Sequence, residues 1–379
     1  MIYFDNAATT PILDECIEIV DNYNSQCFFN PSARYFPSIQ AKKDVENARE
    51  VISRALNCNS SELYFTSSGS EADNWAIKGV IKRPTDRLIV SEAEHPAVYN
   101  TATYLKNKGY DVQFCPVDAF GRVKEDDLIS LLTPNTKLVS IMHVNNETGA
   151  INDIEKLVKI VKNKTKAYVH SDGVQAFGKI YVDLEELGVD LYSISGHKLH
   201  APKGIAGLFV KKGVSIDPLI HGGGQESGMR SSTENVSGIM AFKKAIEIST
   251  KSLKEAQKSA SLVKNLIKDG LMSRFGEDIL WITPDDNSSP FILYMSIKGI
   301  RGEVLLHTLE SEGIYISTGS ACSSKKGNSR LGEAIGLGED FREGTIRLSF
   351  SKYSTTDEAE EFIEKVTPMI GELIKYRRK

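Results

Sequence analysis

Short apolar runs alternate with helical patterns through the middle of the chain. The apolar runs that predict strands lie at residues 63–65, 88–90, 112–114, 138–141, 167–170, 189–194 and 205–210. Apolar residues at helical spacing predict helices at 71–81, 97–107 and 154–163. Strands that alternate with helices predict an α/β domain with a mostly parallel sheet of seven strands and helices on both faces. Ligands of such a sheet bind beyond the carboxyl ends of its strands, so we expect the chemistry there.

A different order of elements follows after about residue 240. A pattern rich in Ala, Lys and Glu over 241–269 predicts one continuous helix that ends at Gly270. The elements predicted after it are hairpin-like strands at 279–282 and 291–297, a helix at 303–312, a strand at 345–350 and a helix from about residue 357. This order indicates a separate, smaller α+β domain. We therefore expect a large domain at residues 15–250 and a small domain at 1–14 and 251–379.

The composition is that of an ordinary globular protein. The chain has 379 residues, 41% of them hydrophobic, which is enough for one large and one smaller domain. A net charge of −4 leaves no basic field to attract nucleic acid. No stretch approaches about 18 consecutive apolar residues, and the N-terminus has neither a charged leader nor an apolar signal core. We expect a cytoplasmic protein that binds neither nucleic acid nor a membrane directly.

The cysteines point to reactivity at one position. The chain has five cysteines, widely scattered and without a Cys-x-x-Cys pair, which argues against a disulfide framework and against a structural zinc site, so no metal is expected. Cys16 and Cys115 lie in apolar patterns and read as buried small hydrophobic residues. Cys322 instead lies among small polar residues, and Lys325 and Lys326 would favour its thiolate. We interpret Cys322 as a reactive thiol on an exposed loop.

A lysine and an aspartate follow two neighbouring predicted strands. Lys198 follows the strand at 189–194, and Asp172 follows the strand at 167–170. A lysine that bonds covalently to the cofactor and a carboxylate that pairs with a pyridinium nitrogen are the groups that pyridoxal phosphate needs most. Two successive strand ends of a parallel sheet can bring both groups to one ring. Taken alone, Asp172 could equally be a helix cap or a loop hydrogen-bond acceptor.

A phosphate site is indicated where the sequence TSSGSE follows the first predicted strand and opens a helix. Backbone N–H groups and the helix dipole converge there, and Gly69 permits close approach of an anion. A simple helix cap by Ser68 or Ser70 is the alternative for this segment alone. Ser195 and His197 supply further donors, and together the two segments favour a phosphate ester.

Three more side chains suit a cofactor or its substrate. Gln175 can donate a hydrogen bond to the ring hydroxylate. His95, which precedes a proline, is a flat ring that could stack on the cofactor, or simply a turn residue. Arg347, on a predicted strand, could clamp a substrate carboxylate with two hydrogen bonds, or belong to a surface ion pair.

Eight motifs spread over nearly the whole chain carry a family resemblance. They are DNAATT at 5–10, NPSA at 30–33, EADN at 71–74, EHPAV at 94–98, MHVNNETG at 142–149, SGHK at 195–198, GGGQESGMRSSTEN at 222–235 and TGSACSS at 318–324. With these motifs the chain resembles the cysteine desulfurases, which belong to the class V aminotransferase group of the fold-type I pyridoxal phosphate enzymes.

The resemblance implies a reaction and a role for each matching residue. It implies that Lys198 holds the cofactor and moves the α-proton of L-cysteine, that Cys322 takes the sulfur as a persulfide, and that L-alanine leaves. Asn146 corresponds to an asparagine near the cofactor and substrate, and we expect His95 to assist proton transfer. The positions that match the phosphate site are Gly69, Ser70, Ser195, His197 and, from the second subunit of a homodimer, Thr233.

The resemblance also implies a protein that accepts the sulfur, in iron–sulfur cluster assembly or tRNA thiolation. Gln225, Ser227 and Ser232 depart from the common motif near the rim shared by the two subunits. A selenocysteine lyase or an aminotransferase on the same fold is an alternative. A non-catalytic scaffold in sulfur trafficking is another, but the presence of Lys198 together with Asp172 and Cys322 argues against it.

Overall fold

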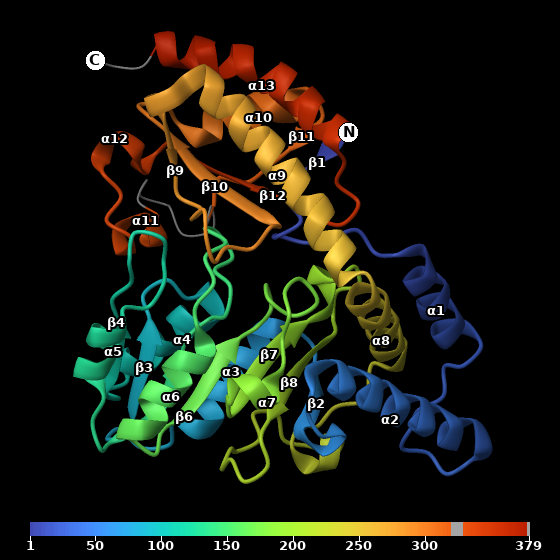
Figure 1. The fold of residues 1–379 in the computed structure, drawn as a ribbon. Helices are drawn as coiled ribbons and strands as arrows, with labels where there is room; N and C mark the ends of the chain where they lie inside the picture. The colour runs from blue at the N-terminus through green and yellow to red at the C-terminus, as the bar shows by residue number, and fades with distance from the viewer. Residues whose placement is uncertain (320–328, 377–379) are drawn as a thin grey trace.

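A seven-stranded sheet forms the centre of the larger lobe of the computed structural model, which describes residues 1–319 and 329–376 (Figure 1). In spatial order its strands are β2 (Leu63–Thr66), β8 (Ala206–Val210), β7 (Leu191–Ser195), β6 (Tyr168–Asp172), β5 (Thr136–Ser140), β3 (Arg87–Ser91) and β4 (Val112–Cys115). Within this sheet β8 runs antiparallel to both of its neighbours, β2 and β7, and all other neighbouring strands are parallel. The predicted mostly parallel sheet of seven strands is confirmed.

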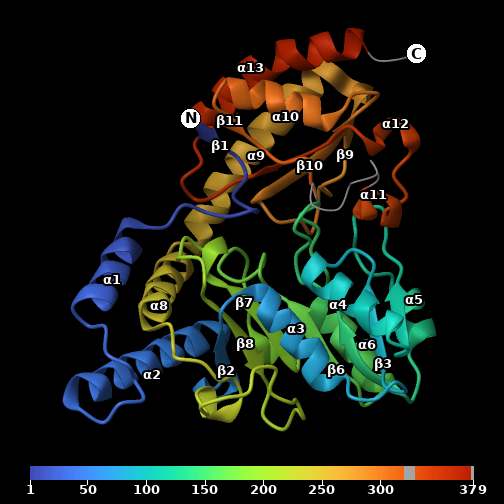
Figure 2. The ribbon, with the colours of Figure 1, turned by 180° about the vertical axis from the view of Figure 1, so that it is seen from behind.

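Helices cover both faces of this sheet because alternate strand residues point to opposite sides. Leu88, Leu138 and Leu208 pack with α3 (Gly69–Val80) and α4 (Pro96–Asn107). Ile89 and Val139 belong to the opposite core, where the helices are α2 (Phe36–Leu56), α5 (Glu125–Leu131), α6 (Ile154–Lys164), α7 (Leu184–Leu187) and α8 (Val236–Lys251). Helices α6 and α7 lie in front of the sheet in Figure 1, and α3 and α4 lie in front of it in the reverse view of Figure 2.

The smaller lobe is built on an antiparallel sheet of β12 (Thr345–Ser349), β10 (Ile292–Ile297) and β9 (Ile279–Trp281). Its helices are α9 (Leu253–Phe275), α10 (Gly302–Ser311), α11 (Arg330–Ala334), α12 (Glu339–Arg342) and α13 (Thr356–Lys375). The N-terminal strand β1 (Ile2–Tyr3) pairs with β11 (Ile314–Tyr315), so the start of the chain lies in this lobe (Figure 1). A separate apolar core of residues 2, 4 and 256–370 supports the predicted small domain, whose boundaries stay a prediction.

The prediction of a single helix over 241–269 that ends at Gly270 is wrong in two respects. Two helices, α8 and α9, are separated at Ser252, which has φ −106° and ψ 18° and whose hydroxyl donates back to the carbonyl of Ile248. The second helix continues through Gly270, where an added Cβ would lie 2.8 Å from Cδ1 of Ile363 on α13. This glycine therefore allows two helices to approach each other and does not end one.

Two N-terminal helices escaped the sequence analysis, α1 (Asp14–Ser25) and α2. The buried residues of α2 include Ala41, Val45, Ala48 and Ile52, which follow the three- and four-residue spacing of an amphipathic helix. Four short 3₁₀ turns complete the described elements: η1 (Ser60–Glu62), η2 (Gly196–Lys198), η3 (Glu226–Gly228) and η4 (Gly276–Asp278). Within residues 1–319 and 329–376, no helix has the length and apolar character needed to cross a membrane.

Candidate active site

The carboxyl ends of β6 and β7 bring Asp172 and Lys198 to the same edge of the large sheet. Asp172 is the last residue of β6, and Lys198 ends the 3₁₀ turn that follows β7. The two strands are parallel neighbours, as the sequence predicts. The Nζ atom of Lys198 donates hydrogen bonds of 2.6 Å to the carbonyl oxygens of Ala7 and Ala8, so the segment after β1 lies over this edge.

Burial shifts the pKa values of both groups toward neutrality. Asp172 is 4% exposed, and burial raises the pKa of its carboxyl to about 6, against the opposing effects of the Val174 N–H and of Lys198. Burial lowers the pKa of Lys198 to about 8, and the charge of Arg347 lowers it further while Asp5 and Asp172 oppose the shift. An amine with this pKa is partly neutral near pH 7 to 8 and can accept a proton.

His95 is held as a neutral ring next to Asp172. It caps α4, where its Nδ1 accepts a 3.1 Å hydrogen bond from the N–H of Ala97, so the hydrogen of the neutral ring is on Nε2. Burial, then the charges of Lys198 and Arg330, lower the pKa of His95 to about 4. One nitrogen of His95 and one oxygen each of Asp172 and Asp73 lie within 4.8 Å of one another. His95 is thus both a cap and part of this site.

The predicted phosphate donors converge at the start of α3. The helix begins at Gly69, and Ser68 caps it by accepting a 3.1 Å hydrogen bond from the Glu71 N–H, so the capping alternative is realised at Ser68; Ser70 is exposed. A Cβ added to Gly69 would lie 2.9 Å from Cγ2 of Val174 and 3.5 Å from Cβ of Ser195. Three parts of the chain therefore meet at one point: the N-terminus of α3, the turn that follows Asp172, and Ser195.

Ser195 and His197 complete this group of donors. The Oγ atom of Ser195 is buried and has no hydrogen-bond partner among the residues that the structure describes. The half-buried ring of His197 contacts Oγ1 of Thr9 through Nδ1 at 3.1 Å, and burial, followed by the charge of Lys198, lowers its pKa to about 4. A buried hydroxyl without a partner is costly, and a bound phosphate oxygen would satisfy it.

The donor set fits pyridoxal phosphate. Asp172 would hold the ring nitrogen, and Lys198 would form the covalent bond. The residues that would hold the phosphate are Gly69, Ser70, Ser195 and His197. Gln175 would face the ring oxygen: its Nε2 donates to the carbonyl of Ala7 at 2.9 Å, and its Oε1 accepts from Lys179 at 2.7 Å.

Arg347 lies at the junction of the two lobes. It is 5% exposed, its Nη2 is 2.8 Å from Oδ1 of Asp5, and its Nη1 donates to the carbonyl of Asn146 at 2.8 Å. Its Nε is buried and has no partner in the part of the chain that the structure describes. Arg347 is thus ion-paired, but in the interior rather than at the surface, and its role toward a substrate carboxylate stays a prediction.

Two predicted site residues cannot be placed with this group. Thr233 is exposed and lines a different cavity of about 150 Å³ together with Thr66 and Arg230. Cys322 lies outside the described residues. The described residues on either side of its segment do contact the site. Arg330 donates to the carbonyls of Glu92 and Glu94, and Glu94 directly precedes His95.

The sequence analysis missed a buried polar layer beneath Asp172. The ring of His170 contacts Oγ of Ser140 at 2.8 Å and Oγ of Ser193 at 3.0 Å, and Oδ1 of Asp73 lies 3.6 Å from His170 Nε2. Burial, and then the charge of Asp172, raise the pKa of Asp73 well above its usual range. The signal was present as polar residues inside otherwise buried strands. Lys179 and Arg330 were also missed.

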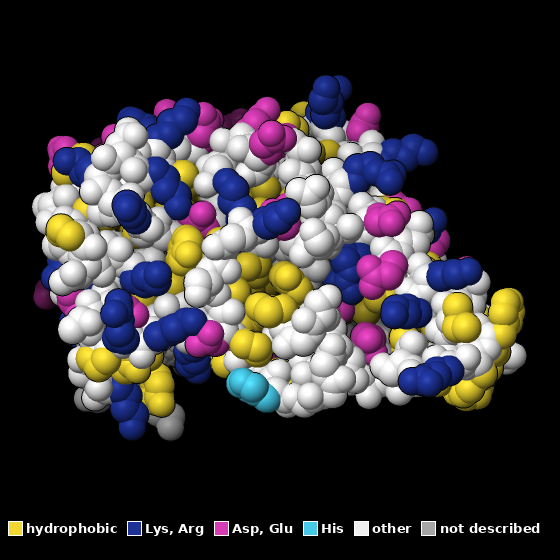
Figure 3. Space-filling view, turned by 90° about the horizontal axis from the view of Figure 1, so that it is seen from below, with side chains coloured by type: hydrophobic (Ala, Val, Ile, Leu, Met, Phe, Trp, Pro, Cys, Tyr) yellow, Lys and Arg dark blue, Asp and Glu magenta, His cyan; other side chains and the backbone are white. Residues whose placement is uncertain are grey.

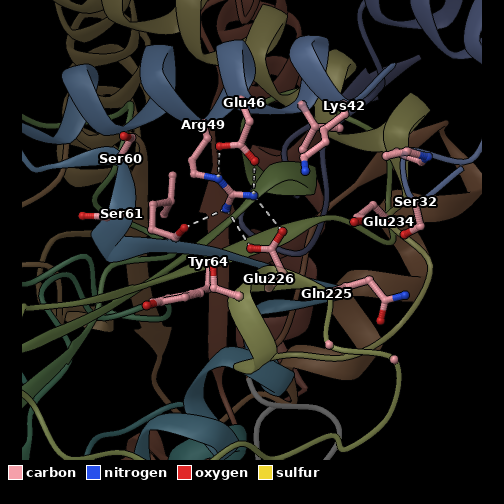
Figure 4. Close-up of a pocket in the computed structure, with 16 residues that line it drawn as sticks. Ser32, Lys42, Glu46, Arg49, Ser60, Ser61, Tyr64, Gln225, Glu226 and Glu234 are labelled. Carbon is pink, nitrogen blue, oxygen red and sulfur yellow. Dashed lines mark hydrogen bonds and ion pairs between the residues drawn. The ribbon is translucent and has the colours of Figure 1, made fainter. Parts of the chain in front are cut away.

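A second cavity, of about 490 Å³, lies between α2 and the loop of residues 223–234 (Figure 4). Arg49 and Glu226 form a two-pronged ion pair in its wall, with Nη1–Oε2 and Nη2–Oε1 distances of 2.7 and 2.8 Å. Glu226 also accepts from the Phe65 N–H at 2.8 Å. This pair holds a loop in which Glu226 and Ser227 have φ of 49° and 57°, in the left-handed region. Gln225, one of the departures noted above, lines the same cavity.

Comparisons with known proteins agree with this geometry. The family described as Aminotransferase class-V matches residues 2–362. The cysteine desulfurase IscS of Clostridium botulinum strain Hall is 40% identical over 383 residues, covering 100% of this chain and 95% of that protein. The solved structure of a NifS-like protein is similar with a TM-score of 0.91 and 39% identity, over 98% of this chain and 100% of that one. A structure described as SspA in complex with cysteine has a TM-score of 0.82 and 31% identity, over 94% and 100%.

Proposed function

Because the chain belongs to the aminotransferase class V family, and within it to the cysteine desulfurases, we propose that it uses pyridoxal phosphate to convert L-cysteine to L-alanine and passes the sulfur to a protein acceptor. The observation that carries this proposal is the pair formed at neighbouring strand ends by the half-buried Lys198 and the buried Asp172. The solved relative in complex with cysteine supports the choice of substrate.

The residues of the site have complementary tasks. When bound, pyridoxal phosphate supplies a covalent link for an amino group and a protonated ring that accepts electrons from the substrate carbon. Asp172 keeps the ring nitrogen protonated, because a buried opposite charge favours the ionised pair. Lys198 takes the α-proton at Nζ, for which its lowered pKa of about 8 suits it. His95 assists proton transfer, and Arg347 and Asn146 bind the substrate.

Sulfur transfer is proposed for Cys322. A bond forms between its Sγ and the sulfur of L-cysteine, while the bond between that sulfur and the substrate β-carbon breaks and the carbon gains a proton. L-cysteine and the Cys322 thiol thus become L-alanine and a Cys322 persulfide, with no outside oxidant or reductant. The hydrogen bonds from Arg330 to the backbone before His95 support this role, because they hold a residue eight positions from Cys322 at the site.

A homodimer is part of the proposal. Hydrophobic side chains gather at the end of the larger lobe that holds α1 and α2 (right in Figure 3). Exposed large apolar residues in this region are Phe28, Tyr35, Phe36 and Ile39, at 65%, 55%, 78% and 45%. A second copy of the chain would remove such a patch from water. We further propose that Thr233 serves the phosphate site of the second subunit.

The acceptor is proposed to be a protein of iron–sulfur cluster assembly or of tRNA thiolation. The relative named IscS supports the sulfur-transfer role as such. The cytoplasmic location expected from the sequence stays a prediction.

Incubation of the purified, pyridoxal phosphate-loaded protein with L-cysteine and a thiol reductant tests the function. We expect alanine and sulfide in equal amounts in this incubation and, when the reductant is left out so that the persulfide is retained, a mass increase of one sulfur on the peptide that contains Cys322. Cys322→Ser should lose both products while it keeps the visible absorption of the bound cofactor. Cys27→Ser, at another free cysteine, should behave like the wild type. Full sulfide release by Cys322→Ser would reject its role, and amino-group transfer to a keto acid without sulfide would reject the desulfurase function.

A further inference from the structure

A buried lysine that the proposed reaction does not use lies one turn beyond Gln175. Lys179 is 7% exposed and lies in the turns that follow Asp172 at the end of β6. Its backbone carbonyl accepts a 2.9 Å hydrogen bond from Gln257 on α9, so the residue is held from both lobes. Lysine is almost never fully buried without a partner, so its position requires an explanation.

The environment of Lys179 is positively charged. Burial, and then the charges of Lys198 and Arg347, lower the pKa of Lys179 to about 7. Besides burial, the charge of Lys179 contributes to the lowered pKa values of His197 and His200. No ion pair among the described residues includes Lys179, whose Nζ instead donates 2.7 Å to Oε1 of Gln175. A cationic pocket of this kind favours an anionic group close to Gln175.

The contact fixes the polarity of the Gln175 amide. The protonated form of Lys179 only donates hydrogen bonds, so in that form the amide must turn its oxygen toward Lys179 and its NH₂ group the other way, as the structure shows. One of the two N–H bonds is used by the carbonyl of Ala7, at 2.9 Å. The same carbonyl accepts from Lys198 at 2.6 Å, which places Gln175 beside the amine that would carry the cofactor. One N–H bond of Gln175 is left for an acceptor in the site.

We propose that Lys179 is a positioning residue that orients the Gln175 amide so that its remaining N–H bond meets the ring oxygen of pyridoxal phosphate. This inference rests on the proposed function, since it requires the cofactor. A donor to the ring oxygen favours its anionic form, and the bound cofactor then loses its proton at lower pH. Lys179 thereby sets the protonation of the cofactor without touching it.

The test is a pH titration of the visible absorption of the cofactor-loaded protein. Lys179→Met removes the donor at similar length, and we expect the apparent pKa of the bound cofactor to rise by about one unit, which is a tenfold change in proton affinity. The affinity for pyridoxal phosphate, measured by fluorescence quenching, should fall about tenfold. Lys179→Gln keeps a donor without the charge and should restore most of the wild-type pKa.

A double variant separates positioning from direct action of the charge. If Lys179 acts through Gln175, the shift in Lys179→Met/Gln175→Met equals that in Gln175→Met alone. Additive shifts would overturn the positioning role, and so would a wild-type titration curve in Lys179→Met. A wild-type protein that binds no pyridoxal phosphate would instead reject the proposed function itself.

A second buried lysine provides the matched control. Lys264 on α9 donates to Oγ of Ser288 at 3.0 Å and to the carbonyl of Ser289 at 3.1 Å, and burial likewise lowers its pKa to about 8. Lys264→Met should lose stability without any change in the absorption titration. An equal shift in this control would show a general effect of removing a buried lysine and overturn the proposal.

Discussion

The carboxyl of Asp172 shows how one residue ties the fold to cofactor binding. Its pKa of about 6, raised by burial from an ordinary value of 3.8, means that it is protonated in acid and ionised at neutral pH. Only the ionised form can pair with a protonated ring nitrogen. The aspartate therefore couples cofactor affinity to pH in a window just below neutrality.

We expect the affinity for pyridoxal phosphate to fall as the pH drops below about 6, by up to tenfold per pH unit, because one proton must leave Asp172 for the pair to form. Fluorescence quenching between pH 5 and 8 measures this. Asp172→Asn should bind more weakly at pH 8 and lose this component of the slope. The same slope in Asp172→Asn would assign the pH dependence to another group, such as the cofactor phosphate.

Residues that follow predicted strands could be assigned from the sequence, and residues defined by distant contacts could not. Lys198 and Asp172 lie at strand ends, so the order of strands and helices indicates their meeting. Lys179 and Arg330 depend on partners that only the folded chain brings close, Gln175 in its observed rotamer and the carbonyls before His95. No local pattern predicts such contacts.

At the scale of elements, the ion pair between Arg49 and Glu226 joins α2 to a loop whose backbone is unfavourable for residues with side chains. The two side chains are 10% and 4% exposed. Removal of one partner leaves the other charge buried and unpaired, which costs more than the pair contributes. The loop around Gln225 therefore depends on a helix that lies more than a hundred residues earlier.

Arg49→Met should lower the free energy of unfolding by about 3–5 kcal/mol, because Glu226 would remain buried without its partner. Denaturation by urea measures the change. Arg301→Met, which removes an exposed ion pair with Glu303, should cost at most about 1 kcal/mol. Equal losses in the two variants would contradict the importance of burial.

A capping box stabilises the start of the last helix, α13. Thr355 caps α13 by accepting from the Glu358 N–H at 3.2 Å, and Glu358 accepts in return from the Thr355 N–H at 2.9 Å. Thr355→Ala should destabilise the protein by about 1 kcal/mol, whereas Thr355→Ser keeps the cap and should stay close to wild type. Thermal unfolding of both variants checks this, and a Ser variant as unstable as the Ala variant would argue against the cap.

The strands and most helices followed from periodicity, since buried strands and amphipathic helices have distinct spacings. The break between α8 and α9 did not follow from periodicity, because a serine and a glycine can each lie inside a helix or at its end, so the sequence does not show that the helix breaks at Ser252 and continues through Gly270. Packing decides: α8 lies on the large lobe, and α9 packs against α13 in the small lobe. The seven-stranded sheet could thus be predicted, and the break between α8 and α9 could not.

At the scale of the whole molecule, the proposal for Thr233 predicts sharing between subunits. Lys198→Ala and Thr233→Ala proteins should each bind the cofactor poorly. A mixed dimer of the two has one complete site, with Lys198 from one subunit and Thr233 from the other. We therefore expect mixing, after brief dissociation, to restore cofactor absorption and desulfurase activity to up to half the wild-type level per mixed dimer. No recovery despite mixed-dimer formation would place Thr233 in its own subunit's site, and normal cofactor binding by Thr233→Ala alone would show that it serves neither site.

The carbonyls of Ala7 and Ala8 hold Lys198, and the hydroxyl of Ser349 accepts a hydrogen bond of 2.9 Å from the Ala7 N–H. During synthesis Ala7 can make this contact only after Ser349 has been added, 342 positions later. We therefore expect the segment that holds Lys198 to reach its place late, once β12 has been synthesised.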